Sequence, residues 1–435
     1  MSNPFDKIIG YEPIRKELER TADALKNTEK YARLGTSAPK GLLLHGEPGV
    51  GKTLMATCLI EASTRKAFVC RKDMPEREFI EYIRAVFEQA ESEAPSIVFL
   101  DDLDKFANGD EDHRNSVEYV TVQTCIDNIR SSDVFVLATA NSLENMPSSL
   151  LRTGRFDRDI EINPPSGEDA VNIVRYYHKG KSFVAEADAE AVAGIMAGLS
   201  CADLETAVNK AGLLAGYENS ETITLRHLIL GCMDIAYSVS PDSIIQGAKT
   251  RDAQLAAYHE AGHALVSEII CPGSVSAICI FDNNGSASGV TSYVSDVSVK
   301  ITEIGDVIDK ITCSMGGLAG TKHKFGIKDI GAERDLISAR YDISRLISDN
   351  AAFGFFFKQA HCDASAEMLS RMEQIAADKV EECYSRAERI ISENDGFFEA
   401  IAKELLKKGL LVAKDIKRIR RKNPTYETFL SHQAV

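Results

Sequence analysis

The chain has 435 residues, 44% of them hydrophobic and 26% charged, and its formal net charge is −15. This balance excludes a disordered chain, and the length suffices for two or three folded domains. The acidic charge would repel a phosphate backbone, so we expect no nucleic acid partner and interpret the basic run from Lys414 to Lys422 as the solvated face of a late helix.

Short apolar runs typical of strands alternate with helical stretches from Pro39 to about Pro165. Such alternation predicts βαβ units around a parallel sheet, in an α/β nucleotide-binding domain over residues 1–165. The expected strands are Gly41 to Leu44, Ala67 to Cys70, Ile97 to Leu100 and Val134 to Ala138.

A phosphate-binding motif follows the first expected strand. Residues Gly46 to Thr53 match the pattern GxxxxGK[ST], between that strand and a helix-prone stretch. The glycines let backbone N–H groups surround the phosphates of ATP, Lys52 neutralises phosphate charge, and the Thr53 hydroxyl binds Mg2+. The predicted nucleotide ligands are Gly46, Pro48, Gly49, Val50, Gly51, Lys52, Thr53 and Leu54.

Two further strands of this domain end in polar residues. Asp101 and Asp102 follow one of them, at the edge where open α/β sheets place ligands, and Asn141 follows the next. We expect Asp101 to hold the magnesium shell, Asp102 to polarise the attacking water and Asn141 to orient it beside the γ-phosphate. Acids after a strand are also common on protein surfaces, so Asp102 alone does not identify the site.

Two arginines follow in the run Leu151-Arg152-Thr153-Gly154-Arg155-Phe156-Asp157. With the P-loop and Asn141, this run resembles the AAA+ ATPases. In that family such arginines reach into the nucleotide site of the neighbouring subunit, where a guanidinium stabilises the charge of the transferring phosphoryl group. The resemblance therefore implies that Arg152 and Arg155 act in a ring of identical subunits, with a hexamer expected.

Residues 166–246 are apolar at helical spacing and include no convincing strand, which predicts a small helical domain. The segment Gly198 to Leu204 is similar to the lid subdomain of AAA+ ATPases. His178 lies where that family often has a histidine that contacts adenine, so the resemblance implies this role for His178. A packed or surface histidine is the alternative.

A polar stretch from Ser240 to Asp252 predicts the next boundary, and a third domain is expected over 247–435. Its first long helix, from about Ala253 to Ile270, contains the HExxH pattern as His259-Glu260-Ala261-Gly262-His263. Histidines four residues apart lie on one helical face, so both can bind one Zn2+ while Glu260 acts as general base on the water. The motif predicts a zinc peptidase.

Catalytic zinc requires a third protein ligand and one open position. The C-terminal half resembles the FtsH-type metalloproteases, in which an aspartate in a stretch like Gly331 to Leu336 completes the site. The resemblance implies Asp335 as this ligand; spacing does not select it, and Glu333 and His323 are the alternatives. The implied reaction is hydrolysis of protein or polypeptide substrates without an acyl-enzyme.

The third domain is expected to be mainly α-helical with one small β-hairpin. Val275 to Phe281 and Gly289 to Val294 form the predicted hairpin, with its turn at Asn283-Asn284-Gly285. Gly289 to Thr291 offers an edge to which an extended peptide can add through backbone hydrogen bonds. A purely structural hairpin is the alternative.

The resemblance to the FtsH family extends from Phe5 to Ala387, and several features depart from it. Asp102 stands where the family has glutamate. The family's N-terminal membrane-spanning segments have no counterpart, so we expect any membrane association to go through a partner. The family's pore loop, an aromatic residue followed by glycines, is not recognisable in Arg71 to Phe79, where Met74 and Phe79 are the candidate replacements.

One more departure concerns the expected zinc site. The stretch Gly316 to Lys322 lacks the acidic residue that the family has after a pair of glycines. A carboxylate near the zinc ligands is therefore expected to be missing, with an effect on zinc affinity.

The ten cysteines show no CxxC pair and no regular spacing, and neither a signal peptide nor a run of eighteen apolar residues occurs. A protein of the reducing cytoplasm fits these features. The main interpretation is an ATP-dependent zinc endopeptidase that uses Zn2+, ATP and Mg2+.

Two alternatives remain. One is an AAA+ remodelling ATPase or chaperone with a weak or inactive peptidase domain, against which the intact zinc motif argues. The other is a zinc peptidase whose ATPase domain serves as a nucleotide-gated scaffold. Asp102 and the altered pore loop keep this second alternative open.

Overall fold

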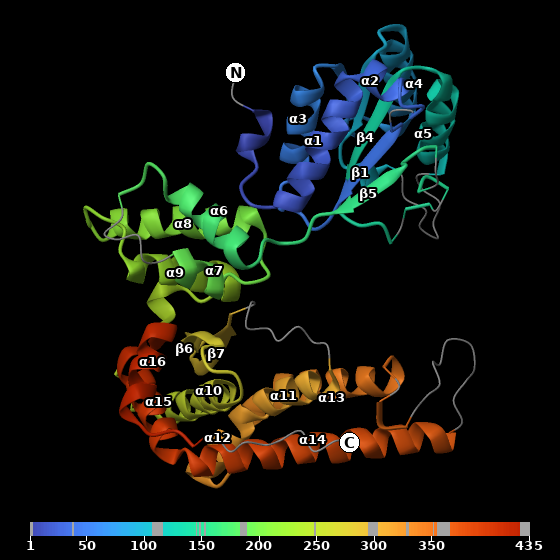
Figure 1. Ribbon diagram of the computed structural model, residues 1–435. Helices are drawn as coiled ribbons and strands as arrows, with labels where there is room; N and C mark the ends of the chain where they lie inside the picture. The colour runs from blue at the N-terminus through green and yellow to red at the C-terminus, as the bar shows by residue number, and fades with distance from the viewer. Residues whose placement is uncertain are drawn as a thin grey trace. The chain divides into compact units, whose positions relative to one another are not determined.

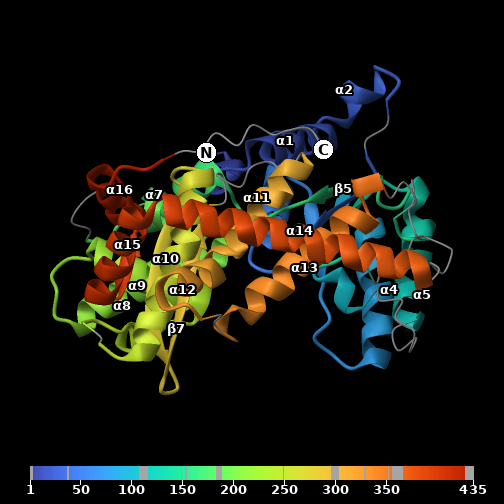
Figure 2. The same cartoon turned by 90° about the horizontal axis from the view of Figure 1, so that it is seen from below.

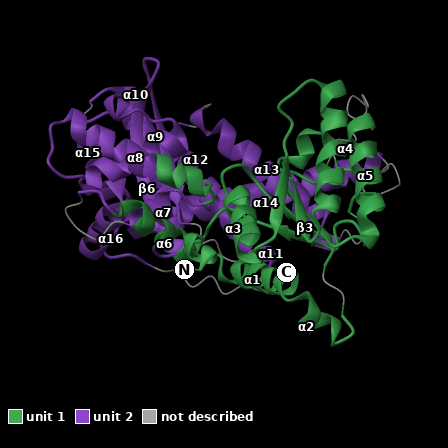
Figure 3. Cartoon of the chain, turned by 90° about the horizontal axis from the view of Figure 1, so that it is seen from above, with its two compact units in different colours: residues 1–179, 198–206 green, residues 180–197, 207–435 purple. Residues whose placement is uncertain are grey.

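The computed structural model describes residues 3–36, 39–106, 116–144, 146–147, 149–151, 154–182, 189–247, 249–294, 303–327, 330–350, 352–354 and 366–426. The chain forms two compact units (Figure 3). The first holds 1–179 and 198–206, and the second holds 180–197 and 207–435. The stretch 166–246 is shared between the units, and the three-domain division stays a prediction. None of the helices in the described residues has both the length and the apolar character that a membrane span requires.

A five-stranded sheet forms the centre of the first unit. Its strands are β1 (Gly41–His45), β2 (Lys66–Cys70), β3 (Ser96–Leu100), β4 (Val134–Ala140) and β5 (Arg158–Glu161). Their order is β2-β3-β4-β1-β5, and every neighbouring pair is parallel. The three inner strands are buried along nearly their whole length, as in parallel sheets covered on both faces. The α/β class and the four predicted strands are confirmed.

Helices cover both faces of this sheet. They are α1 (Glu12–Lys26), α3 (Lys52–Ser63), α4 (Glu76–Ser92) and α5 (Ser116–Asn128). The first unit also includes α2 (Thr28–Ala32) and α6 (Gly167–His178). Figure 1 shows α1 and α3 on one face and α4 and α5 on the other. In α4, Phe79, Ile83, Val86, Phe87 and Ala90 recur at helical spacing and are all buried, which fixes the face that packs on the sheet.

The second unit is built around α10 (Arg251–Ile270), in which every residue from Ala257 to Glu268 is buried. A helix without a polar face is stable only when other elements surround it. The helices that contact it are α11 (Ile304–Ser314), α12 (Gly316–Phe325), α14 (Ala366–Glu393) and α15 (Asp395–Lys408). The second unit also includes α7 (Ala189–Ile195), α9 (Leu225–Tyr237), α13 (Glu333–Ser348) and α16 (Ala413–Lys422). The helix α8 (Cys201–Tyr217) begins in the first unit and continues in the second.

A small antiparallel sheet packs against α10. It consists of β6 (Val275–Asn283), β7 (Ser286–Tyr293) and β8 (Leu410–Val412), in the order β7-β6-β8. The first two strands form the predicted hairpin, whose turn places Asn284 and Gly285 at φ values of 55° and 86°. The third strand is not predicted by the sequence pattern. Because β6 is in the middle, β7 is an edge strand.

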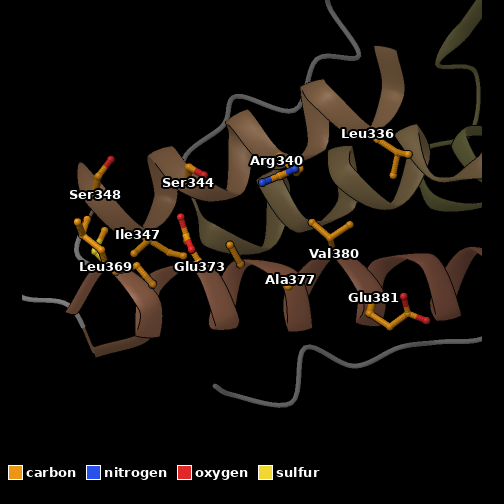
Figure 4. Close-up of a pocket in the computed structure, with 12 residues that line it drawn as sticks. Leu336, Arg340, Ser344, Ile347, Ser348, Leu369, Glu373, Ala377, Val380 and Glu381 are labelled. Carbon is orange, nitrogen blue, oxygen red and sulfur yellow. The ribbon is translucent and has the colours of Figure 1, made fainter. Parts of the chain in front are cut away.

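The 28-residue helix α14 contacts α10, α11, α12 and α13, and it is the long helix that crosses the second unit in Figure 2. A groove of 590 Å³ lies between α13 and α14 (Figure 4). Its lining is largely apolar but includes Arg340, Glu373 and Glu381, and it begins at Leu336, one residue after Asp335.

Candidate nucleotide and metal sites

The P-loop connects β1 to the start of α3. Gly46, Gly49 and Gly51 have φ values of 146°, 84° and 101°, which only glycine adopts readily, and these turns wrap the loop around the Lys52 ammonium. Lys52 is 6% exposed and donates to the carbonyl oxygens of Gly46 at 2.7 Å and Glu47 at 2.8 Å. Burial lowers the pKa of Lys52 against the opposing effect of nearby aspartates. A buried cation inside a glycine loop fits a phosphate ligand.

The sheet order brings the predicted polar residues to this loop. Because β3, β4 and β1 are neighbours, Asp101 and Asn141 emerge beside the start of α3. The Thr53 hydroxyl lies 3.3 Å from Asp101 Oδ1, and Lys52 Nζ donates to Asn141 Oδ1 at 2.9 Å. A hydroxyl next to a carboxylate is the donor set expected around Mg2+ in a P-loop site.

Asp102 follows Asp101 in a left-handed backbone conformation, with φ 55°. Its backbone N–H donates to the Thr139 hydroxyl at 2.9 Å, and its carboxylate accepts a hydrogen bond from Lys105 Nζ at 2.6 Å. Lys105 thus occupies one of the two carboxylate oxygens of Asp102. Its catalytic role stays a prediction.

A cavity of 380 Å³ extends from the P-loop to α6 and the start of α8, within the first unit. Tyr176 and Tyr177 line it together with Tyr11, whereas His178 does not. The remaining lining residues are Lys7, Ile8, Ile9, Gly49, Val50, Gly51, Leu54, Met55, Ile173, Cys201, Ala202 and Glu205. His178 is thus outside the lining of this cavity, and its contact with adenine stays a prediction.

The two arginines of the predicted ring contact have different outcomes. Arg152 lies outside the described residues. Arg155 binds Asp127 through both guanidinium ends, with a 2.7 Å contact from Nη2, and its side chain is 11% exposed. This hydrogen bond lowers the pKa of Asp127 although partial burial opposes the shift. Arg155 is therefore engaged within its own chain.

The two candidate replacements for an aromatic pore residue, Met74 and Phe79, both pack against the core of the first unit. The interpretation of Phe79 as such a replacement is wrong, because α4 begins at Glu76 and turns Phe79 into the core, where its ring packs edge-on against Phe106. Met74 is partly buried against the same core. Only Arg71 to Pro75 connect the strand to the helix.

The HExxH residues lie in the middle of α10, and the third ligand comes from another helix. His259 Nε2 and His263 Nε2 are 3.1 Å apart, and each is 3.2 Å from Asp335 Oδ2 in the first turn of α13. Among the described residues, this is the one group of three histidine, cysteine or acidic side chains that could hold a metal.

The dimensions of this triangle fit zinc. Tetrahedral Zn2+ with bonds of 2.0–2.1 Å keeps its ligand atoms about 3.3 Å apart. Burial would raise the pKa of Asp335, but hydrogen bonds from both imidazoles outweigh it and hold that pKa well below its ordinary value. Burial would likewise lower the pKa of His263, and Asp335 reverses this effect and raises it. Three mutually dependent polar groups in an apolar interior are the expected state of a metal-free zinc site.

The competing ligands are not in this cluster. Glu333 is exposed, and His323 Nε2 pairs with Asp395 at 2.9 Å.

A backbone contact orients one of the metal ligands. The carbonyl of Cys313 accepts a hydrogen bond from Nδ1 of His263 at 2.9 Å, which directs Nε2 towards the site. This backbone contact cannot be recognised from the sequence pattern.

Glycines allow α12 to approach the site. A Cβ on Gly262 would lie 2.1 Å from the Gly316 carbonyl oxygen, and a Cβ on Gly317 would lie 2.4 Å from His259 Nε2 and 2.5 Å from His263 Nε2. Two adjacent glycines in a helix reduce its intrinsic stability, which is a sequence signal for close packing. From the sequence, this glycine pair indicates only that the acidic residue that follows it in the family is absent, and the close packing against α10 is not predicted.

The edge strand β7 holds the predicted general base. The Thr291 hydroxyl donates to Glu260 Oε2 at 2.6 Å, and a Cβ on Gly289 would lie 2.4 Å from Glu260 Cγ. Residues 289 and 291 face the same side of the strand, so together they form a slot for the carboxylate. The sequence predicts this strand but not its contact with Glu260.

Two family models match the chain. Residues 42–164 match the ATPase family associated with various cellular activities (AAA), and residues 247–419 match peptidase family M41.

Similar relatives are bacterial proteins described as ATP-dependent zinc metalloproteases. FtsH 2 of Thermoanaerobacter sp. (strain X514) is 28% identical, over 95% of this chain and 82% of the relative. FtsH of Helicobacter pylori (strain J99) is 27% identical, over 95% of this chain and 70% of the relative. FtsH 1 of Methylacidiphilum infernorum is 29% identical, over 98% of this chain and 72% of the relative.

Proposed function

Because the chain belongs to the FtsH-type family, which joins an AAA ATPase to a peptidase family M41 domain, we propose that it is an ATP-dependent zinc endopeptidase of protein substrates. The observation that carries the proposal is the triangle of His259, His263 and Asp335, with Glu260 beside it in the slot of an edge strand. Three neutral or anionic ligands and one adjacent carboxylate suit metal-assisted hydrolysis.

The residues of the peptidase site have distinct roles. When bound, Zn2+ supplies a Lewis acid at the position shared by the three ligands. Glu260 takes a proton from the attacking water and passes it to the leaving amine, while Thr291 holds one oxygen of this carboxylate. Within the described residues β7 pairs with β6 alone, and we assign its other edge to an extended substrate, which would add through backbone hydrogen bonds with little sequence preference.

In the ATPase site, Lys52 balances phosphate charge, Thr53 and Asp101 contribute to the magnesium shell, and Asn141 orients the attacking water. We assign Arg152 and Arg155 to contacts between subunits of a homo-oligomeric ring, with six subunits expected. Since Arg155 is bound to Asp127 in its own chain, that pair has to open for a contact in trans.

An unfolded substrate such as casein, incubated with and without ATP and zinc, tests the function. Degradation that requires both is the expected result. Glu260→Gln is expected to abolish proteolysis and to spare zinc binding and ATP turnover, whereas Lys52→Ala is expected to abolish ATP turnover. Absence of cleavage under every condition, with zinc and nucleotide both bound, would leave only the remodelling ATPase.

Two observations favour a second candidate, a zinc peptidase with a nucleotide-gated ATPase scaffold. Asp102 is bound to Lys105, and the linker between β2 and α4 has no aromatic residue to grip a chain. In this case casein is cleaved at the same rate with ATP, with ADP or after Lys52→Ala. Zinc removal with 1,10-phenanthroline stops cleavage in both candidates.

A reducing compartment is also proposed. Nine of the ten cysteines lie in the described residues and all nine are free thiols, several of them deep in the core. Cytoplasmic location, with any membrane recruitment through a partner, accords with this chemistry.

A further inference from the structure

Both oxygens of the Asp101 carboxylate have partners within the protein. It is 1% exposed, and its Oδ1 accepts hydrogen bonds from the hydroxyls of Thr139 at 2.8 Å and Thr53 at 3.3 Å. Its Oδ2 forms an ion pair with the guanidinium of Arg71, whose side chain is 58% exposed. Thus an exposed cation pairs with one oxygen of the predicted magnesium residue.

The sheet register places Arg71 at this position. Strands β2 and β3 are parallel, with Cys70 opposite Leu100, so the next residues on each strand are Arg71 and Asp101. The backbone N–H of Asp101 also donates to the Cys70 carbonyl at 3.0 Å. The pairing of β2 with β3 therefore places the backbone of Arg71 beside that of Asp101.

Arg71 is also the first residue of the linker that leads to α4. The next residue, Lys72, binds the fully buried Glu118 at 2.9 Å, and the other end of the linker is fixed where α4 begins. The backbone of this short connection is therefore held at both ends, while the Arg71 side chain is largely exposed.

We propose that Arg71 is a competing cation of the ATPase site, which holds Asp101 when no magnesium nucleotide is bound and has to leave it when the magnesium shell forms. The proposal rests on the ATPase function proposed above. A guanidinium and a divalent cation repel each other, so Arg71 at Oδ2 opposes a magnesium shell that forms beside Thr53 at Oδ1 of the same buried carboxylate. By linkage, any contact that draws Arg71 away from Asp101 strengthens magnesium binding to the same extent.

The consequence is a coupling between nucleotide state and the linker from Arg71 to Pro75. Magnesium nucleotide at the site favours the state in which Arg71 is released from Asp101. Conversely, an anionic group of a binding partner that pairs with Arg71 favours magnesium binding. The chemistry of such a group is that of a carboxylate on a polypeptide, since a guanidinium pairs with carboxylates through two hydrogen bonds.

The test measures the binding of a fluorescent ADP analogue to the full chain over a series of free Mg2+ concentrations. Arg71→Gln removes the charge, and Arg71→Lys keeps it. Lys66→Gln is the matched control, because Lys66 begins the strand β2 that Arg71 follows and has the same 58% side-chain exposure, but pairs with Glu93. We expect Arg71→Gln to lower the half-saturating Mg2+ concentration at least about threefold, Arg71→Lys to stay near the original chain, and Lys66→Gln to leave it unchanged.

Three results would overturn the proposal. These are an unchanged Mg2+ requirement in Arg71→Gln, an increased requirement, or a loss of ATP turnover at saturating Mg2+ with the requirement unchanged, which would assign Arg71 to the reaction itself. Failure of the proposed function has a different appearance: the original chain and Lys52→Ala would bind the analogue equally poorly. Casein cleavage and circular dichroism of each variant check that the fold is intact.

Discussion

Gly317→Ala is expected to destroy the zinc site while leaving the fold and the ATPase in place. The new Cβ would lie 2.4 Å from His259 Nε2 and 2.5 Å from His263 Nε2, where ordinary carbon contacts are about 3.5 Å. One or both ring nitrogens must therefore retreat by about 1 Å, whereas zinc bonds tolerate deviations of about 0.2 Å. We expect zinc affinity to fall by at least about 100-fold, with loss of casein cleavage.

The measurement is zinc content per chain by atomic absorption, followed by competition with a chelator of known affinity. Gly396→Ala is the matched control, because Gly396 is also a helical glycine of the second unit and an added Cβ there meets no atom within 4 Å. This control should keep its zinc and its proteolysis. The reasoning is refuted if Gly317→Ala retains close to one zinc per chain at unchanged affinity.

Three further predictions concern side chains at or near the two sites. Thr291→Val keeps the shape of the side chain but removes its hydrogen bond to Glu260, and it should lower kcat for a peptide about tenfold at unchanged zinc content. Thr291→Ser keeps the hydroxyl and should restore kcat. Equal kcat values for the two variants would contradict this role. Asp335→Ala should lose zinc, whereas Glu333→Ala should keep it, as metal analysis of the purified variants will show. Asp127→Asn should lower the urea midpoint of unfolding at pH 7, because the hydrogen bond from Arg155 holds the pKa of Asp127 below its ordinary value of 3.8 in the folded chain. This stabilisation is lost as the pH falls below 3.8 through the lowered pKa of the folded state, so the difference between variant and original chain should shrink there. A difference of unchanged size at acid pH would be inconsistent with an ionic contribution.

The strands that sequence reasoning identifies are those with the strongest burial requirement. The inner strands β1, β3 and β4 are covered on both faces, so their residues are apolar without interruption. By contrast, β5 reads Arg-Asp-Ile-Glu over Arg158–Glu161 and buries only Ile160, and β8 has three residues. Such short edge strands form because neighbouring strands offer backbone partners, which leaves no pattern in their own sequence.

The zinc site shows the same division between local and distant information. His259, Glu260 and His263 share one helix, so their spacing alone indicates their chemistry. Asp335 lies 72 residues beyond His263 on another helix, and only the resemblance to a family singles it out. The slot formed by Gly289 and Thr291 depends on how the hairpin packs against α10, a tertiary relation that periodicity does not encode.

One interpretation was wrong although the sequence held the signal against it. Phe79, Ile83, Val86 and Phe87 follow the spacing of a buried helical stripe. Phe79 is the first residue of that stripe and lies in the first turn of α4, so it belongs to the helix and not to the preceding loop. The side chain with the most apolar surface in the segment is therefore used for packing.

The linker from Arg71 to Pro75 has two cations, an acid, a half-buried methionine and a proline, but no ring with which to pull. In the second candidate function, in which the ATPase domain only gates the peptidase, the opening of a folded client is left to thermal fluctuation. Its rate of destruction would then track how often each client opens locally, as in native-state proteolysis. Such an enzyme would sort its clients by their own folding thermodynamics, removing damaged or unassembled chains and sparing intact ones without reading any tag.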